Sequence, residues 1–314
     1  MSVWERRSGS RRHHEPNDAP DPEPADAPAR LDASLPDRDW TVLPAASRVF
    51  RFAAPSGQLA AFELGDPAAP RVLLLPGATG SKEDFVLLAP LLADAGYFVQ
   101  SHDLAGQYES SAAGPPAGEP YDYALFVADL IAFLDAGTTP AHVLGYSFAG
   151  IVAELALAER PELFASLVLL GVPPQPGQAF RGVRWIGPLS RVLPPRRIAA
   201  LTIWGIVSNV NRVPPGRLAL VRMRFDRTRR RSVDEIVGLM KHTPDLRAVL
   251  RQASVPLLVA VGDRDVWPTQ LHRDFAGRIG AEIRVYRTGH SPCETTPHQL
   301  ARDLLALYRA AGQR

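Results

Sequence analysis

Hydrophobic positions divide most of this chain into two alternating kinds of segment. Short runs without polar interruption, such as Leu167-Val168-Leu169-Leu170, are typical of strands buried on both faces of a sheet. Longer segments compatible with helices lie between these runs. The pattern predicts strands over residues 71–75, 97–103, 142–146, 166–172, 257–261 and 282–286, and helices over 82–95, 121–136, 148–160, 268–279 and from Pro297 onward.

A hairpin is predicted ahead of this alternation. The runs Val49–Phe52 and Leu59–Leu64 are separated by Pro55-Ser56-Gly57, a turn sequence that favours antiparallel pairing. Ser81 and Asp84 have the spacing of a capping box for the first helix, and Thr296 before Pro297 has the pattern of an N-cap. The fold class expected is α/β, with a mostly parallel sheet flanked by helices.

The alternation is interrupted once. It stops at Pro173 and resumes at Pro256, and the intervening stretch contains only helix-compatible segments, around residues 196–209, 214–225, 232–242 and 244–252. We therefore divide the chain into a core (47–172 and 254–314) and an inserted helical segment (173–253).

The first residues differ in composition from the rest. Up to about residue 40 they are rich in proline and charge and poor in apolar side chains, so they cannot bury enough surface to offset their chain entropy. A disordered tail over residues 1–46 is predicted.

No apolar stretch follows the arginines near the N-terminus, as a secretory signal would require. The longest candidate for a membrane span is the uncharged segment Ile198–Asn211, which has 14 residues, too few to cross a bilayer. We expect a cytoplasmic protein.

Four motifs carry the candidate chemistry. The strand Val143–Tyr146 leads into Ser147 and then Phe148-Ala149-Gly150, a strand-to-helix turn of small residues that would present the serine hydroxyl. A second tight turn, at 76–80, follows the strand predicted at 71–75. Asp263 and Asp265 follow the strand predicted at 257–261, and His290 follows the strand predicted at 282–286. A serine, an acid and a histidine at the carboxyl ends of neighbouring strands suit nucleophilic acyl transfer.

These motifs, in this order, resemble the α/β-hydrolase family over about residues 47–314. The resemblance implies a cofactor-independent serine hydrolase with Ser147 as nucleophile and His290 as general base and then acid. The family pattern Gly-X-X-Asp favours Asp265 over Asp263 as the acid that orients the histidine. The oxyanion hole would use the N–H groups of Ala78 and Phe148, and the inserted segment would be a helical cap over the site.

The resemblance also implies a substrate pocket near the reaction centre, for which we select Gly77, Tyr146, Trp204 and Trp267. Trp204 would either roof the pocket or pack only against other cap helices. Three positions depart from the family pattern: Pro76 replaces the common histidine, Ala149 replaces a glycine of the serine motif, and Tyr108 replaces the second glycine of the loop that begins at Asp103.

The expected reaction is hydrolysis of a carboxylic ester, or alternatively of a thioester or amide. Carbon–carbon bond hydrolysis, cofactor-free perhydrolysis or a non-catalytic ligand sensor remain open. A carboxylate nucleophile, as in dehalogenases and epoxide hydrolases of this fold, is disfavoured because residue 147 is serine. The substrate would be a small molecule, and the chain itself leaves its oligomeric state open.

Composition excludes several other classes. Histidines and acids do not recur at ligand spacing, so we expect no metal, and the net charge of +2 does not predict nucleic-acid binding. A single cysteine, Cys293, rules out a disulfide framework and is expected to be buried.

Residues 181–231 contain thirteen arginines and one acid. They predict either an anionic partner, such as a carrier-linked acyl group or an acidic membrane surface, or simply arginine as the general surface cation of a chain with two lysines.

Overall fold

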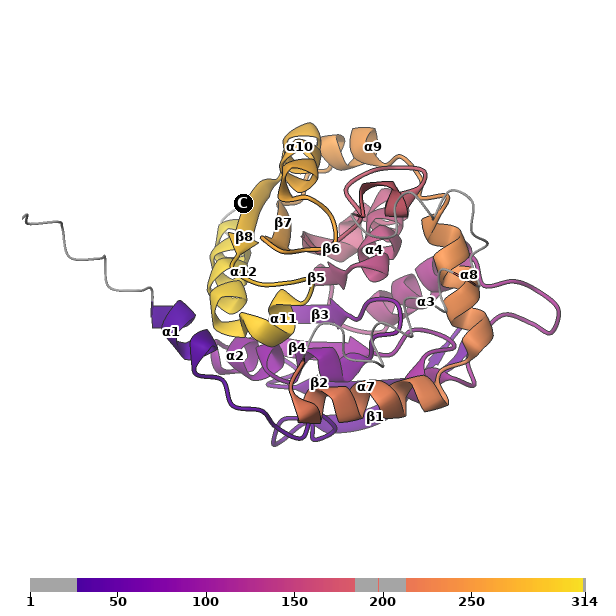
Figure 1. Ribbon diagram of the computed structural model, residues 1–314, viewed down its shortest axis with the longest axis horizontal. Helices are drawn as coiled ribbons and strands as arrows, with labels where there is room; N and C mark the ends of the chain where they lie inside the picture. Colours follow the sequence, from indigo (N-terminus) through magenta and orange to yellow (C-terminus); the bar gives the residue numbers. More distant parts are fainter. Residues whose placement is uncertain (1–26, 184–196, 198–212, 313–314) are drawn as a thin grey trace, which may run out of the picture.

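One sheet organises the chain in a computed structural model, which describes residues 27–183, 197 and 213–312 (Figure 1). Its strand order is β1-β2-β4-β3-β5-β6-β7-β8. Strands β1 and β2 form the predicted hairpin, β2 also pairs antiparallel with β4, and all later neighbours are parallel. The strands are β1 (Arg48–Ala54), β2 (Gly57–Leu64), β3 (Arg71–Leu75), β4 (Phe98–His102), β5 (Ala141–Tyr146), β6 (Phe164–Leu170), β7 (Leu257–Gly262) and β8 (Glu282–Tyr286). The predicted mostly parallel α/β sheet is confirmed.

Helices cover both faces of this sheet. Successive side chains of a strand point to opposite faces, so Leu73 and Leu75 of β3 join one apolar cluster while Val72 and Leu74 join another. The first cluster is covered by α3 (Tyr123–Asp135), α4 (Phe148–Glu159), α9 (Arg247–Gln252) and α10 (Thr269–Ile279). The second is covered by α2 (Leu88–Asp94), α11 (Pro292–Thr295) and α12 (Pro297–Gly312). Figure 1 shows α2 and α12 on the left of the sheet and α3 and α4 on the right.

The predicted helix over 82–95 is instead two pieces. A 3₁₀ turn, η1 (Lys82–Phe85), precedes α2. Pro90 explains the break, because a proline lacks an N–H and its ring would clash with the carbonyl four residues earlier, at Val86. Pro90 is tolerated in the first turn of the shorter helix. The Ser81 N–H still donates to Asp84 Oδ2, at 3.3 Å, as one half of the predicted capping box.

Within the inserted segment, the described residues contain the helices α7 (Pro215–Arg227), α8 (Arg230–Met240) and α9. They correspond to three of the four predicted helical segments; the remaining one, 196–209, lies outside the described residues except for Arg197. Helix α8 is bound to the loop that follows β4, because Arg229 N and Ser232 Oγ both donate to Gly106 O at 3.0 Å. Helices α7 and α8 therefore lie at the carboxyl end of the parallel strands (Figure 1).

The prediction that residues 1–46 are disordered is wrong for residues 27–46. Helix α1 (Ala27–Ala33) packs on α12, and Trp40 is buried. Asp32 accepts hydrogen bonds from the backbone N–H groups of His298 and Gln299, at 2.9 and 3.2 Å, and so caps α12 from a distance. Asp32 and Trp40 find partners elsewhere in the fold, which composition alone does not reveal. Residues 1–26 lie outside the described residues.

That distant cap also corrects the prediction for Thr296. Its hydroxyl donates to Pro292 O at 3.2 Å and thus belongs to the preceding short helix, while Asp32 takes the free N–H groups of α12. Cys293 is buried, as predicted.

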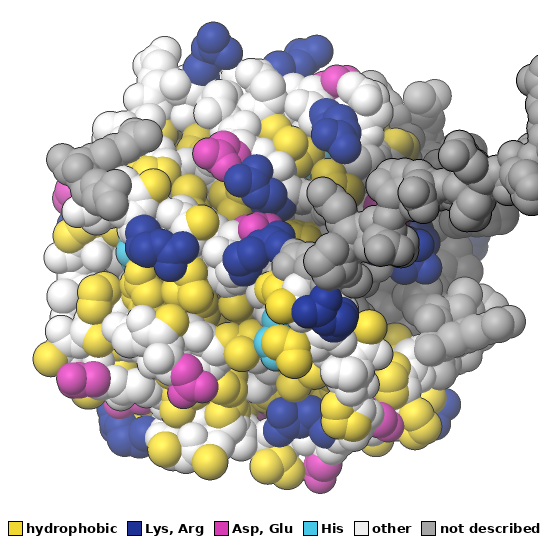
Figure 2. Space-filling view, turned by 90° about the vertical axis from the view of Figure 1, so that its left-hand side faces the viewer, with side chains coloured by type: hydrophobic (Ala, Val, Ile, Leu, Met, Phe, Trp, Pro, Cys, Tyr) yellow, Lys and Arg dark blue, Asp and Glu magenta, His cyan; other side chains and the backbone are white. Residues whose placement is uncertain are grey.

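The surface mixes both signs of charge. On the face drawn in Figure 2, Lys and Arg side chains lie among Asp, Glu and hydrophobic side chains. Across the part of the chain that the structure describes, no helix is long and apolar enough to cross a membrane.

Candidate active site

Ser147 occupies a strained turn between β5 and α4. Its φ and ψ are 53° and −117°, a left-handed conformation that costs a non-glycine residue of the order of 1–3 kcal/mol. The turn is held because Ser147 N donates to Leu170 O on the neighbouring strand at 2.8 Å. It also needs small neighbours: a Cβ on Gly145 would lie 2.6 Å from Gly150 Cα, and one on Gly150 would lie 2.1 Å from Val172 Cγ2. The backbone thus presents the hydroxyl at the end of the sheet.

The structure brings Ser147, His290 and Asp265 together. His290 Nε2 lies 3.2 Å from Ser147 Oγ, and His290 Nδ1 lies 2.9 Å from Asp265 Oδ1. Asp265 is fully enclosed, with 0% of its side chain exposed, whereas Asp263 is 43% exposed and pairs with Arg264 at 3.4 Å. Of the two aspartates between which the sequence left a choice, Asp265 is the one that contacts the histidine.

Charge within this group follows from burial and pairing. Burial opposes the charged form of each group, but mutual attraction and the hydrogen bond outweigh it. The pKa of His290 is therefore raised above its usual value, and the pKa of Asp265 is lowered. Asp265 is thus ionised at neutral pH and accepts the hydrogen bond from His290 Nδ1, an arrangement that directs Nε2 toward Ser147 Oγ.

Gly171 is a further requirement of this geometry that sequence reasoning missed. It follows β6 with φ of 55°, and a Cβ there would lie 3.1 Å from His290 Nδ1 and 3.3 Å from Asp265 Oδ2. Any side chain would press on the histidine–aspartate contact. The signal in the sequence is a glycine directly after a buried strand, at the same sheet edge as Ser147.

The predicted oxyanion donors lie beside Ser147. A Cβ on Gly77 would lie 3.2 Å from Ser147 Cβ, so the turn after β3 passes directly against the serine. This turn is held by Gly80 N, which donates to Gly77 O at 2.9 Å, and by Thr79 N, which donates to Gln107 Oε1 at 3.1 Å. Among the described residues, neither Ala78 N nor Phe148 N donates to a protein acceptor. Unpaired N–H groups are uncommon in the interior and mark a place where a ligand oxygen can bind.

Two aromatic residues enclose His290. The Tyr146 ring lies 5.2 Å from the imidazole, and its hydroxyl is 2.7 Å from Ser291 Oγ. The Trp267 ring lies 5.6 Å from the imidazole and donates through Nε1 to Ala179 O at 2.7 Å. Both predicted pocket residues therefore adjoin the site. Trp204 lies outside the described residues.

Other buried titratable groups of the described residues make no hydrogen bond to Ser147, His290 or Asp265. Burial lowers the pKa of His102, His142 and His272 to about 4 each, so all three are neutral at neutral pH. Among the described residues, no three His, Cys, Asp or Glu side chains form a group that could hold a metal ion. Sequence reasoning also missed a buried ion cluster next to the turn at residues 76–80, called the oxyanion turn below after the role predicted for it, in which Asp84 and Glu294 contact arginines of α7.

Known proteins with similar sequences match only part of this chain. Epoxide hydrolase A of Mycobacterium tuberculosis is 36% identical over 131 residues, which cover 40% of this chain and 40% of that protein. A serine hydrolase-like protein of Homo sapiens is 33% identical over 124 residues, which cover 39% of this chain and 60% of that protein. The matches thus span between two-fifths and three-fifths of the length of these relatives.

Solved structures match over nearly their whole length. A hydrolase from Pseudomonas aeruginosa aligns with a TM-score of 0.67 at 23% identity, over 84% of this chain and 99% of that one. A thermophilic esterase from Thermogutta terrifontis aligns with a TM-score of 0.65 at 20% identity, with the same coverage of each chain. These likenesses show the fold. The sequence profile of the alpha/beta hydrolase family matches residues 72–303. The chain belongs to the alpha/beta hydrolase family.

Proposed function

We propose that this protein is a serine hydrolase that cleaves a carboxylic ester, or alternatively a thioester or amide, through an acyl-enzyme. The observation that carries the proposal is the continuous contact from Ser147 Oγ to His290 Nε2 (3.2 Å) and from His290 Nδ1 to Asp265 Oδ1 (2.9 Å). A nucleophile, a base and an acid that orients the base, each within hydrogen-bond reach of the next, are what acyl transfer requires.

The chemistry would proceed in two halves. Ser147 Oγ attacks the carbonyl carbon while its proton moves to His290 Nε2, and the oxygen that becomes negative accepts hydrogen bonds from the N–H groups of Ala78 and Phe148. The carbon–oxygen bond to the leaving group then breaks, and His290 gives the proton to the departing alcohol. Water, deprotonated by His290, attacks the acyl-enzyme in the same way and releases the acid and Ser147. These steps use only protein groups and water.

The identity of residue 147 bears on the main alternative within the family. Because it is serine, the carboxylate attack expected of epoxide hydrolases of this fold has no nucleophile at this position. Carbon–carbon bond hydrolysis and perhydrolysis would use the same three residues. A ligand sensor has no need of all three, nor of the two unpaired N–H groups, and their joint presence favours an enzyme.

We further infer that residues 173–253 act as a cap. In support, α7 and α8 contact the loops that follow β3 and β4, on the side of the sheet where Ser147 lies. A cap at this edge would shape the substrate pocket and exclude water from it.

The test is the variant Ser147→Ala. It should lose at least about a thousandfold in kcat on p-nitrophenyl esters, because the members of such a group act as a unit. It should also fail to react with a fluorophosphonate probe that labels the wild type. Ser34→Ala, an exposed serine in the N-terminal segment, is the matched control and should retain both.

Several outcomes are decisive. Retention of more than a tenth of wild-type kcat by Ser147→Ala would remove Ser147 as nucleophile. A wild-type protein that neither reacts with the probe nor cleaves any ester from acetate to palmitate would favour a sensor. Labelling without ester cleavage would turn the search to thioesters, amides and carbon–carbon bonds.

A further inference from the structure

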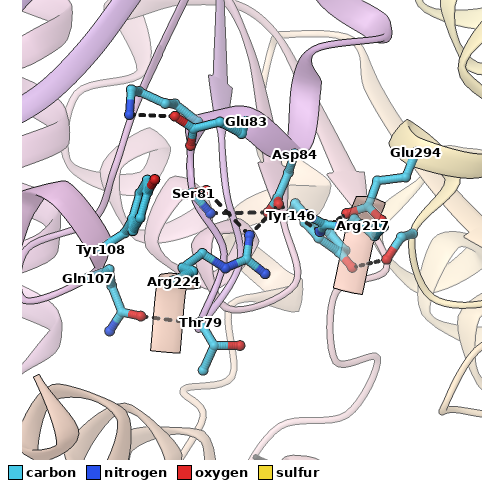
Figure 3. A network of polar contacts seen from close by, with 12 residues as sticks. Thr79, Ser81, Glu83, Asp84, Gln107, Tyr108, Tyr146, Arg217, Arg224 and Glu294 are labelled. Atoms are coloured by element: carbon cyan, nitrogen blue, oxygen red, sulfur yellow. Dashed lines mark hydrogen bonds and ion pairs between the residues drawn. The ribbon is translucent and has the colours of Figure 1, made fainter. Parts of the chain in front are cut away.

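A buried ion cluster joins helix α7 to the residues that follow β3 and to helix α11 (Figure 3). Arg217 of α7 donates through Nη2 to Asp84 Oδ1 at 2.9 Å, and through Nε to Glu294 Oε2 at 2.8 Å. A second hydrogen bond joins Arg217 Nη2 to Glu294 Oε1. Arg224, two turns further along α7, donates to the same Asp84 oxygen at 2.6 Å. Two arginines thus face two carboxylates, and all four side chains are buried.

The two carboxylates belong to different parts of the reaction centre. Asp84 adjoins the oxyanion turn: its Oδ2 accepts from Ser81 N at 3.3 Å, and a Cβ on Gly80 would lie 2.5 Å from that oxygen. Glu294 lies in α11, four residues after His290, and Glu294 N donates to Ser291 O at 3.1 Å. Arg217 is therefore a bridge between the turn that carries Ala78 and the segment that carries His290.

The bridge depends on the shape of a guanidinium group. Its planar fork offers several N–H donors in fixed directions, so one side chain binds both carboxylates at once. A lysine ammonium is a single point of charge on a flexible stem and would favour one carboxylate at the expense of the other. The guanidinium carbon of Arg217 also lies 5.2 Å from the centroid of the Trp40 ring, which restricts the movement of the group.

We propose that Arg217 is a positioning residue that fixes the oxyanion turn relative to His290, through Asp84 on one side and Glu294 on the other. The inference rests on the proposed serine hydrolase function. It assigns to α7 a direct role in holding the reaction centre together, beyond covering it. Nothing in the geometry places Arg217 in contact with Ser147, His290 or Asp265, so its effect would pass through the segments that it joins.

The test compares Arg217→Lys with Arg222→Lys. Both keep the positive charge and lie on α7, but Arg222 is exposed. Arg217→Lys should lower kcat about tenfold to a hundredfold with a much smaller change in KM, because misplacement of catalytic groups affects the transition state more than binding. Arg222→Lys should leave both constants near their wild-type values.

A second measurement separates positioning from a loss of stability. The pKa of the His290 imidazole is followed by NMR, with the signal assigned from its absence in His290→Gln. Because the charge at 217 is unchanged, a lower pKa in Arg217→Lys would report that His290 has moved away from Asp265 or Glu294, the two carboxylates that raise it. A folded Arg217→Lys protein with wild-type kcat and an unchanged imidazole pKa would overturn the proposal.

Asp84→Asn keeps the proposal testable if Arg217→Lys does not fold. An asparagine can still accept from Arg217 but its amide nitrogen cannot accept from Ser81 N, so only the oxyanion side of the bridge is altered. It should lower kcat while leaving the imidazole pKa unchanged; an unaltered kcat would contradict the bridge. If the wild type itself proves inactive, the proposed function fails, whereas the NMR comparison still decides whether Arg217 positions His290.

Discussion

At the scale of single residues, backbone strain gathers around the candidate site. The described residues include four non-glycine residues with positive φ, and apart from Ala46 these are Thr79, Tyr108 and Ser147, at 62°, 38° and 53°. Each is held by its own N–H, which donates to Gln107, Thr228 and Leu170 respectively. Tyr108 takes the position at which the family pattern has a glycine. Strain of this kind persists where surrounding contacts impose it, as they do at active sites.

The choice between the two aspartates gives a prediction at this scale. Asp265→Asn should lower kcat by about a thousandfold or more, because the amide cannot hold the His290 tautomer that accepts a proton from Ser147. Asp263→Asn, which alters an exposed ion pair, should change kcat by less than about threefold. Steady-state kinetics on one p-nitrophenyl ester would decide, and the reverse ranking would assign the acid to residue 263.

The same pair predicts a pH effect. Activity requires neutral His290, so kcat/KM should rise with pH through the pKa of His290, which Asp265 raises above the usual value near 6.5. In Asp265→Asn this rise should move to lower pH, because burial then lowers the imidazole pKa with only the charge of Glu294 left to oppose it. A rise that stays at the wild-type pH would show that the contact with Asp265 does not control the titration.

At the scale of elements, distant side chains complete helix ends that local sequence leaves open. The first turn of helix α12 leaves the N–H groups of His298 and Gln299 without a hydrogen-bond acceptor inside the helix. Asp32 of α1 accepts a hydrogen bond from each of them. Its carboxylate also accepts from the two side chains, at 2.8 Å from His298 Nδ1 and 2.9 Å from Gln299 Nε2. A negative group at a helix N-terminus further gains from the helix dipole.

Asp32→Ala should therefore destabilise the protein by about 1–2 kcal/mol, as the loss of a helix N-cap typically does. Asp94→Ala is the control, since Asp94 is an exposed acid at the end of α2, and it should change stability by less than about 0.5 kcal/mol. Urea unfolding of both variants measures the difference. Equal midpoints would mean that the Asp32 carboxylate does not stabilise the start of α12.

At the scale of the whole molecule, the interior holds an acid that opposes folding at neutral and higher pH. Glu154 of α4 is buried, its Oε1 finds no partner, and burial raises its pKa to about 8. An unfolded chain would ionise it near 4.5. Its contribution to stability is therefore fully present below about pH 4.5 and is lost as the pH rises toward 8.

Glu154→Gln removes this titration while keeping the shape of the side chain. Relative to the wild type, the variant should gain stability as the pH rises from 5 to 8, by at most about 1.4 kcal/mol for each pH unit. Chemical unfolding of both proteins at several pH values measures the difference. A difference in unfolding free energy that does not vary with pH would contradict the assignment of a neutral Glu154 in the folded state.

Features that depend on neighbours along the chain could be predicted from the order of the residues. Uninterrupted apolar runs identify strands buried on both faces, and small residues around Ser147 identify a tight turn, because both requirements are local. The order of Ser147, Asp265 and His290 after successive strands predicts their meeting, since parallel strands end at one edge of a sheet. Pro90 would have indicated the break before α2 as well.

Which charged side chains are buried together follows from the folded arrangement and from nothing local in the chain. Arg217 meets Glu294 across 77 positions and Asp84 across 133, and Asp32 meets His298 across 266. Judged by residue type alone, these side chains would be placed on the surface. No regular spacing along the chain relates one partner to the other. Arg230 and Arg231, by contrast, are about half exposed and pair with Asp234 and Glu235 four residues further along the same helix, a spacing that the sequence itself displays. A charge enters the interior only when the fold supplies its partner, and that partner comes from a distant part of the chain.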